Sequence, residues 1–123
     1  MGIKQNQVNL LGRVGWKDFK YTENGTAIAT INLGVKRGTT WDNFFIKFFN
    51  TKTRNLAEEI GEYLKEGDYI QVTGRLVESK FTPTGSDKEI SKIEIVGSNF
   101  KHVRFNEETQ EFEFSDGSHG HSN

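Results

Sequence analysis

Residues 39–50 read TTWDNFFIKFFN and are too rich in aromatic side chains for an ordinary surface strand. Successive side chains of a strand point to opposite faces, so this segment has an even face and an odd face. The even face, with Phe44, Ile46 and Phe48, is purely apolar and is predicted to face a core. The odd face alternates rings with an amide and a cation, at Trp41, Asn43, Phe45, Lys47 and Phe49.

Two interpretations of the odd face follow from these residues. Rings beside a cation and an amide suit a ligand that has flat, stackable faces and negative charge, and single-stranded nucleic acid is such a ligand. Alternatively, the strand is buried on both sides and Lys47 extends along its aliphatic stem to reach water. The rest of the chain is needed to choose between them.

The composition bounds the class of protein. A chain of 123 residues is long enough for one domain with a modest core. It has no cysteine, which excludes disulfides, zinc–cysteine sites and cysteine nucleophiles and favours a reducing compartment. No apolar run approaches the roughly 20 residues of a membrane span, and the N-terminus has no secretory pattern. We therefore expect a soluble, cytoplasmic protein.

The charge is divided unevenly along the chain. Residues 1–104 hold all 16 Lys and Arg against 12 Asp and Glu, a balance of +4, whereas residues 105–123 hold the other five acids. We predict a basic folded domain over 1–104 and a tail over 105–123, acidic at first and then rich in Gly, Ser and His. A short hairpin could form over 103–114, and the end is expected to be disordered. The acidic segment either competes with DNA for a basic groove or confers solubility.

Alternating apolar residues predict four strands besides the aromatic one, over residues 7–14, 27–35, 69–76 and 88–96. A helix is predicted before the fourth strand, because Asn55 is a good N-cap and Glu58 completes a capping-box arrangement. Gly67 is expected to end it. Its apolar face would hold Leu56, Ile60, Tyr63 and Leu64. Five strands with one helix after the third are the arrangement of an OB-fold barrel, an all-β fold that often binds oligonucleotides.

Three further rings follow the first predicted strand, at Trp16, Phe19 and Tyr21. They could extend a stacking surface, but closing the core is the favoured role.

Four segments in order resemble one family. They are NLLGRV at 9–14, NGTAIATINL at 24–33, YLKEGD at 63–68 and IQVTGRL at 70–76. Over about residues 6–103 the chain resembles the bacterial and phage single-stranded DNA-binding proteins. The resemblance implies an OB-fold protein, usually a homotetramer (a dimer is the alternative), that binds and protects single strands in replication, recombination or repair. It implies no enzymatic activity and no cofactor.

The resemblance also implies where the ligand binds. The family's stacking rings lie on the third strand and at the start of the last hairpin, positions that here hold Trp41, Phe45, Phe49 and Phe81. The first three belong to the odd face defined above. Cations that could contact phosphate are Arg13, Lys36, Arg37, Lys47, Lys52, Arg54, Arg75, Lys80 and Lys88. For any one of them, a solvated surface charge is the alternative. No metal site is expected, since His119 and His121 without a third ligand make a poor one.

Three departures from the family pattern affect the expected interactions. The connection over 36–40 is shorter than usual, and residues 51–54 add basic charge to a longer one. The chain ends in SHGHSN, without the acidic Pro-Phe tip that docks replication or recombination proteins in cellular members. The alternative function is an OB-fold accessory subunit that acts through protein contacts in a primosome or recombination complex. An OB-fold enzyme would need clustered carboxylates on the barrel face, and the sequence suggests none.

Overall fold

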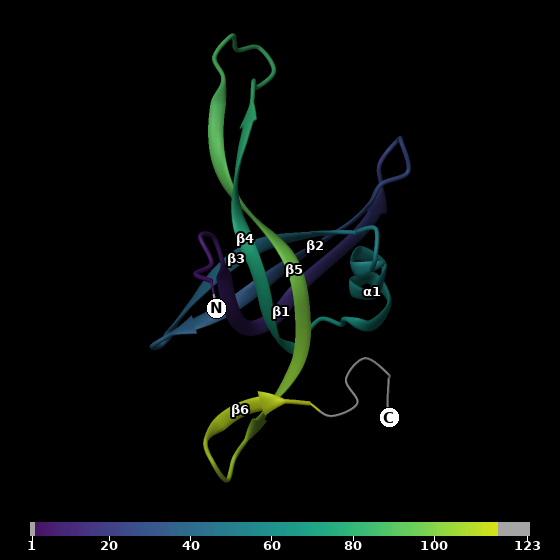
Figure 1. Cartoon of the computed structure of the whole chain (residues 1–123). Coiled ribbons are helices and arrows are strands. Elements are labelled where there is room, and N and C mark those ends of the chain that lie inside the picture. The colour runs from purple at the N-terminus through teal and green to yellow at the C-terminus, as the bar shows by residue number, and fades with distance from the viewer. Residues whose placement is uncertain (1, 116–123) are drawn as a thin grey trace.

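Seven elements follow one another in the computed structural model, which describes residues 2–115 (Figure 1). They are β1 Val8–Tyr21, β2 Ala27–Arg37, β3 Thr40–Phe49, α1 Leu56–Tyr63, β4 Tyr69–Phe81, β5 Ile90–Asn106 and β6 Glu111–Phe114. The strand order is β3-β2-β1-β4-β5-β6, and a parallel pairing of β3 with β5 closes the first five strands into a barrel. The predicted five-stranded OB-fold is confirmed, with a sixth strand added.

The barrel core is built from the inward faces of the strands. Ile46 and Phe48 are fully buried, and Phe44 packs partly buried against them, as the even face of the aromatic strand predicted. Gly97 on β5 makes the closure possible, because a Cβ atom there would lie 2.2 Å from the Phe48 ring. A glycine therefore lets β5 approach β3 where the two strands pair.

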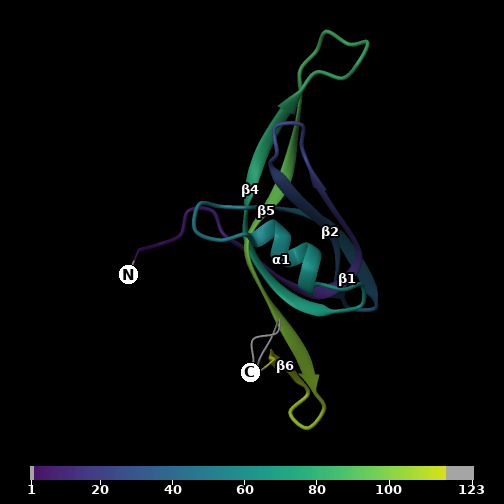
Figure 2. The same ribbon diagram turned by 90° about the vertical axis from the view of Figure 1, so that its right-hand side faces the viewer.

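Helix α1 covers one side of the barrel, against β1, β2 and β3 (Figure 2). Leu56 and Ile60 are buried, as is Leu64 just after the helix, but Tyr63 is 42% exposed and does not belong to the apolar face. Placing Tyr63 there was wrong. The helix also ends at Tyr63, earlier than the predicted end at Gly67. Gly67 does have positive φ, of 96°, but it serves the turn that leads into β4.

The two ends of α1 are stabilised by residues outside it. Asn55 makes no side-chain cap, contrary to the prediction. Instead the Asn50 side-chain oxygen accepts hydrogen bonds from the amides of Ala57 (2.9 Å) and Glu58 (3.3 Å). At the other end, Lys17 Nζ donates to two carbonyls, those of Gly61 (2.9 Å) and Leu64 (2.6 Å). A cation at a helix C-terminus also complements the helix dipole.

Two hairpins project from opposite ends of the barrel (Figure 1). The outer parts of β4 and β5 form a long arm, on which Leu76 is 46% exposed. At the other end β5 continues through Arg104 to Asn106 and pairs with β6. No helix within residues 2–115 is long and apolar enough to cross a membrane.

Candidate nucleic-acid interface

The outer surface of β1, β2 and β3 carries three exposed rings. On β3, Trp41 lies opposite Lys36 of β2, and Phe45 lies opposite Asn32. Asn32 in turn lies opposite Trp16 of β1. The exposed fractions are 42% for Trp41, 62% for Phe45 and 44% for Trp16. We call Trp16, Trp41, Phe45 and Lys36 the aromatic face.

Trp16 belongs to the aromatic face because of a bulge in β1. Val14 pairs with Leu33 and Trp16 pairs with Asn32, so Gly15 is an extra residue in the ladder. An extra residue reverses the alternation of all that follow. Trp16 consequently points outward and contacts Phe45 edge to face, with ring centroids 6.2 Å apart. The favoured core role for Trp16 was wrong.

The other two rings near the end of β1 have separate roles. Phe19 packs against the core, as favoured from the sequence. Tyr21 is 58% exposed, so a core role for it was wrong. Its hydroxyl lies 3.1 Å from a Glu58 carboxylate oxygen on α1, to which it donates a hydrogen bond, and it meets Phe19 edge to face.

Trp41 is held flat on the sheet at a place that lacks a side chain. A Cβ atom on Gly34 would come within 3.2 Å of the Trp41 ring, so the glycine leaves room for the indole to lie against β2. Lys36 Nζ stands 5.4 Å from the ring centroid, within the range of a cation–π contact. Arg13, Asn43 and Trp41 line a hollow of about 220 Å³ beside it.

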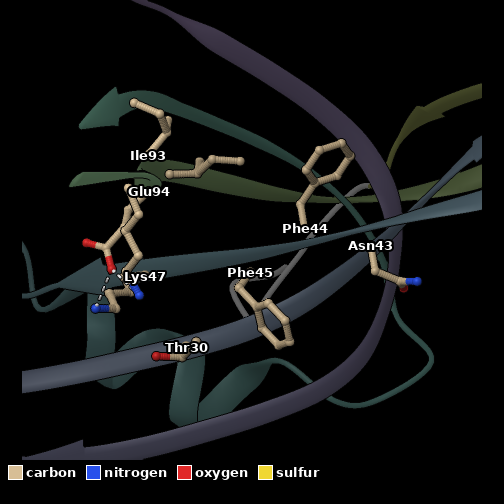
Figure 3. A pocket seen from close by; sticks show the side chains of 9 residues that line it. Thr30, Asn43, Phe44, Phe45, Lys47, Ile93 and Glu94 are labelled. Atoms are coloured by element: carbon tan, nitrogen blue, oxygen red, sulfur yellow. Dashed lines mark hydrogen bonds and ion pairs between the residues drawn. The ribbon is translucent and has the colours of Figure 1, made fainter. Parts of the chain in front are cut away.

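A larger hollow of about 430 Å³ lies between β3 and β5, and we call it the β3–β5 hollow. Figure 3 shows Lys47 and Glu94 meeting at one end of it and Asn43 at the other, with Phe44 and Phe45 between them. One Glu94 oxygen is 3.1 Å from Lys47 Nζ and 3.5 Å from that of Lys92. The hydrogen bond from Lys47 lowers the pKa of the Glu94 carboxyl, so it is ionised at neutral pH.

The two remaining stacking candidates differ from the rings of the aromatic face. Phe49 is less accessible, and Phe81 lies apart from that face. Phe49 is on the same side of β3 but half-buried, opposite Ile28. Phe81 ends β4 on the arm, is 44% exposed, and has Lys92 Nζ 5.8 Å from its ring centroid.

The candidate phosphate-binding cations divide into two groups. Arg37 is paired with Asp42 (2.8 Å), which lowers the pKa of that carboxyl, and Lys47 is paired with Glu94. Arg54 binds Glu59 (2.8 Å) and also donates to Asn99 (2.6 Å), so it joins the loop before α1 to β5. Arg37 stays exposed although it is paired, and the other exposed cations of the set are Arg13, Lys36, Lys52, Arg75, Lys80 and Lys88.

The exposed cations are not gathered at one place. Arg13 and Lys36 adjoin the aromatic face, whereas Lys80 and Lys88 belong to the arm. Arg75 lines a different hollow together with Lys4 and Asn6. Within residues 2–115, no group of three or more His, Cys, Asp or Glu side chains is placed to hold a metal ion.

A closed five-stranded barrel with a helix between its third and fourth strands, and with rings and cations on an outer face, defines an OB-fold protein of the oligonucleotide-binding type. Known proteins narrow this class. The model of the single-strand binding protein family matches residues 5–103. The chain belongs to that family, as its sequence resemblance predicted.

Individual relatives agree with this assignment. A single-stranded DNA-binding protein of Xylella fastidiosa is 33% identical over 99 residues, 72% of this chain and 58% of the relative. Single-stranded DNA-binding protein A of Bacillus subtilis is 41% identical over 76 residues, 58% of this chain and 44% of the relative. The chain thus spans about half the length of the curated relatives it matches.

A similar solved structure is a Plasmodium falciparum SSB complex with ssDNA. It has a TM-score of 0.66 and 26% identity, and the similarity covers 85% of this chain and 100% of that one.

Proposed function

We propose that this chain binds single-stranded DNA with little overall sequence preference and protects it during replication, recombination or repair. The observation that carries the proposal is the aromatic face, where three rings stay exposed beside a cation. Each base stacked on a ring gains about 1–3 kcal/mol whatever its identity. Phosphate contacts add a salt-sensitive contribution that does not depend on sequence.

The relatives support the same role. Those compared above carry the name single-stranded DNA-binding protein, and the Plasmodium falciparum structure is a complex with ssDNA. We assign binding to residues 1–104, with the tail over 105–123 outside the interface. The homotetramer, with a dimer as the alternative, is carried over from the family resemblance. Light scattering after gel filtration tests it.

Individual residues receive roles according to their exposure. Trp41 and Phe45 stack bases, and Trp16 adds a third ring to the path. Phe81 stacks a base on the arm, while Phe49 contributes less because it is half-buried. Phosphates are contacted chiefly by the exposed cations Arg13, Lys36, Lys52, Arg75, Lys80 and Lys88.

The test is a titration with oligothymidylate while tryptophan fluorescence is followed. We expect quenching on binding, because Trp16 and Trp41 would both stack on bases, and weaker binding as salt rises. Trp41→Ala and Phe81→Ala should each reduce affinity by about fivefold or more, given the gain per stacked base. A folded Trp41→Ala protein that binds as tightly as the wild type would remove Trp41 from the site.

A second candidate function is that of an OB-fold accessory subunit acting through protein contacts. The β5–β6 hairpin favours it, because Phe105 is 46% exposed and Phe114 is 53% exposed there, far from the arm (Figure 1). Large exposed apolar side chains gathered at one place are typical of protein-binding surfaces. This function predicts no salt-dependent binding to oligothymidylate, so the same titration separates the two.

A further inference from the structure

The β3–β5 hollow exists because two strands pair over only part of their length. The parallel ladder begins at Ile46 opposite Ile95. On the N-terminal side of this ladder, residues 43–45 of β3 and 92–94 of β5 line opposite sides of the hollow. A volume of about 430 Å³ falls within the range of small-ligand sites, about 300–1,000 Å³.

The rim of the hollow is apolar and exposed. Phe45 is 62% exposed and Ile93 is 64% exposed, and both side chains line the hollow. Phe45 also belongs to the aromatic face, so a DNA strand stacked along that face passes the mouth of the hollow. A flat, mostly apolar group that enters would cover surface now open to water.

The polar end of the hollow combines one carboxylate with two ammonium groups. The same oxygen of Glu94 lies 3.1 Å from Lys47 Nζ and 3.5 Å from Lys92 Nζ. Its side chain is only 19% exposed. A phosphate at this position would meet the carboxylate and be repelled, although two lysines stand beside it. Lys47, Lys92 and Glu94 all line the hollow, so the group offers two cationic donors and one anionic acceptor.

Two donors with one acceptor match the groups on one kind of base edge. The imide edge of thymine or uracil presents a carbonyl oxygen, an N–H and a second carbonyl oxygen. The N3–H can donate to Glu94 while the two carbonyls accept from Lys47 and Lys92. Cytosine has no proton on N3, so in the same orientation its lone pair would face the carboxylate. Turning cytosine to place its amino group on Glu94 leaves one lysine without a base contact.

We propose that the β3–β5 hollow holds one unstacked base and that Glu94, between Lys47 and Lys92, makes it prefer thymine or uracil over cytosine. This rests on the proposed function and adds a local preference to otherwise sequence-tolerant binding. Glu94 is then a specificity-determining residue. The preference is small, because a single position contributes to it while the remaining bases are stacked without discrimination.

The test compares oligodeoxyuridylate with oligodeoxycytidylate of equal length, which differ only at the base edge. Binding of each is measured by fluorescence titration for the wild type, Glu94→Gln and Glu62→Gln. Glu62 is an exposed residue of α1, so its change alters net charge equally but away from the hollow. Circular dichroism checks that each variant is folded.

We expect the wild type and Glu62→Gln to prefer oligodeoxyuridylate by about fivefold, a modest value for one base contact. Glu94→Gln should bring the ratio near one, because the amide can donate to cytosine N3 as readily as it accepts from uracil. A wild-type ratio near one, or a ratio that Glu94→Gln leaves unchanged, overturns the inference. Absence of binding to both oligonucleotides would instead overturn the proposed function itself.

Discussion

At the scale of the residue, one glycine marks the place where Trp16 turns onto the aromatic face. Gly15 is the extra residue in β1, and a Cβ atom at that position would lie 3.2 Å from the Asn32 side chain. Because Gly15 shifts the alternation, Trp16 turns outward, while Lys17 turns toward the end of α1 and Phe19 toward the core. The bulge thus contributes both to the aromatic face and to the packing of the helix.

Trp16→Ala should weaken oligothymidylate binding. If Trp16 stacks on a base, its loss removes about 1–3 kcal/mol, which is about fivefold or more in affinity. The matched control is Phe114→Ala, a ring 53% exposed on the β5–β6 hairpin, which should leave affinity unchanged. Equal binding by Trp16→Ala and the wild type would show that only the β3 rings of the aromatic face stack on bases.

Alternation by twos was enough to predict the two faces of β3. Ile46 and Phe48 are buried and Trp41 and Phe45 are exposed because no bulge interrupts the pairing of β3 with β2. The same alternation predicted the wrong face for Trp16, because it assumes that no residue is inserted and Gly15 is an inserted residue. The available signal was Gly15 itself, because a glycine inside a strand pattern often marks a bulge.

At the scale of the element, α1 begins where a distant side chain caps it. The Asn50 side chain, beyond the end of β3, accepts hydrogen bonds from two amides in the first turn. Those amides have no partner within the helix. The end of β3 therefore determines where α1 starts, and this ties the helix to the barrel before any apolar packing is considered.

Asn50→Ala should destabilise the protein, whereas Asn55→Ala should have little effect. Loss of a helix cap costs about 0.5–2 kcal/mol, and Asn50 is the residue that performs it here. Urea unfolding followed by circular dichroism measures both variants. If Asn55→Ala proves the more destabilising of the two, the cap belongs to the residue next to the helix after all.

The sequence was sufficient to predict the order of elements but not their ends. Five strands and one helix in the OB order came from alternation and helix periodicity alone. The helix cap could not be found locally, since Asn50 precedes the first helical residue by six positions and its approach depends on tertiary structure.

At the scale of the whole molecule, the arm and the acidic β5–β6 hairpin lie at opposite ends of the barrel (Figure 1). The arm carries Lys80 and Lys88 together with Glu78, Asp87 and Glu89, so the clearest charge asymmetry is the acidity of the hairpin. On that hairpin the Glu113 carboxylate accepts hydrogen bonds from the Asn106 side chain (3.2 Å) and from Arg104 (2.9 Å), and these bonds lower its pKa. The exposed acids of the hairpin face solvent at a distance from the arm, so they should act on DNA through their field and not by contact.

Replacing Glu107, Glu108 and Glu111 with Gln tests whether the hairpin acts through its field. The change takes the formal net charge from −1 to +2. It leaves in place the hydrogen bonds of the turn that use the Glu108 amide and the Glu107 carbonyl, because these are backbone groups. We expect about twofold tighter oligothymidylate binding at low salt and no difference near 1 M, where the screening length falls to about 3 Å. The control replaces Glu23, Glu62 and Glu66 with Gln, an equal charge change elsewhere, and should give a similar gain. A larger gain for the hairpin variant that persists at high salt would mean that the acidic segment itself occupies the binding face.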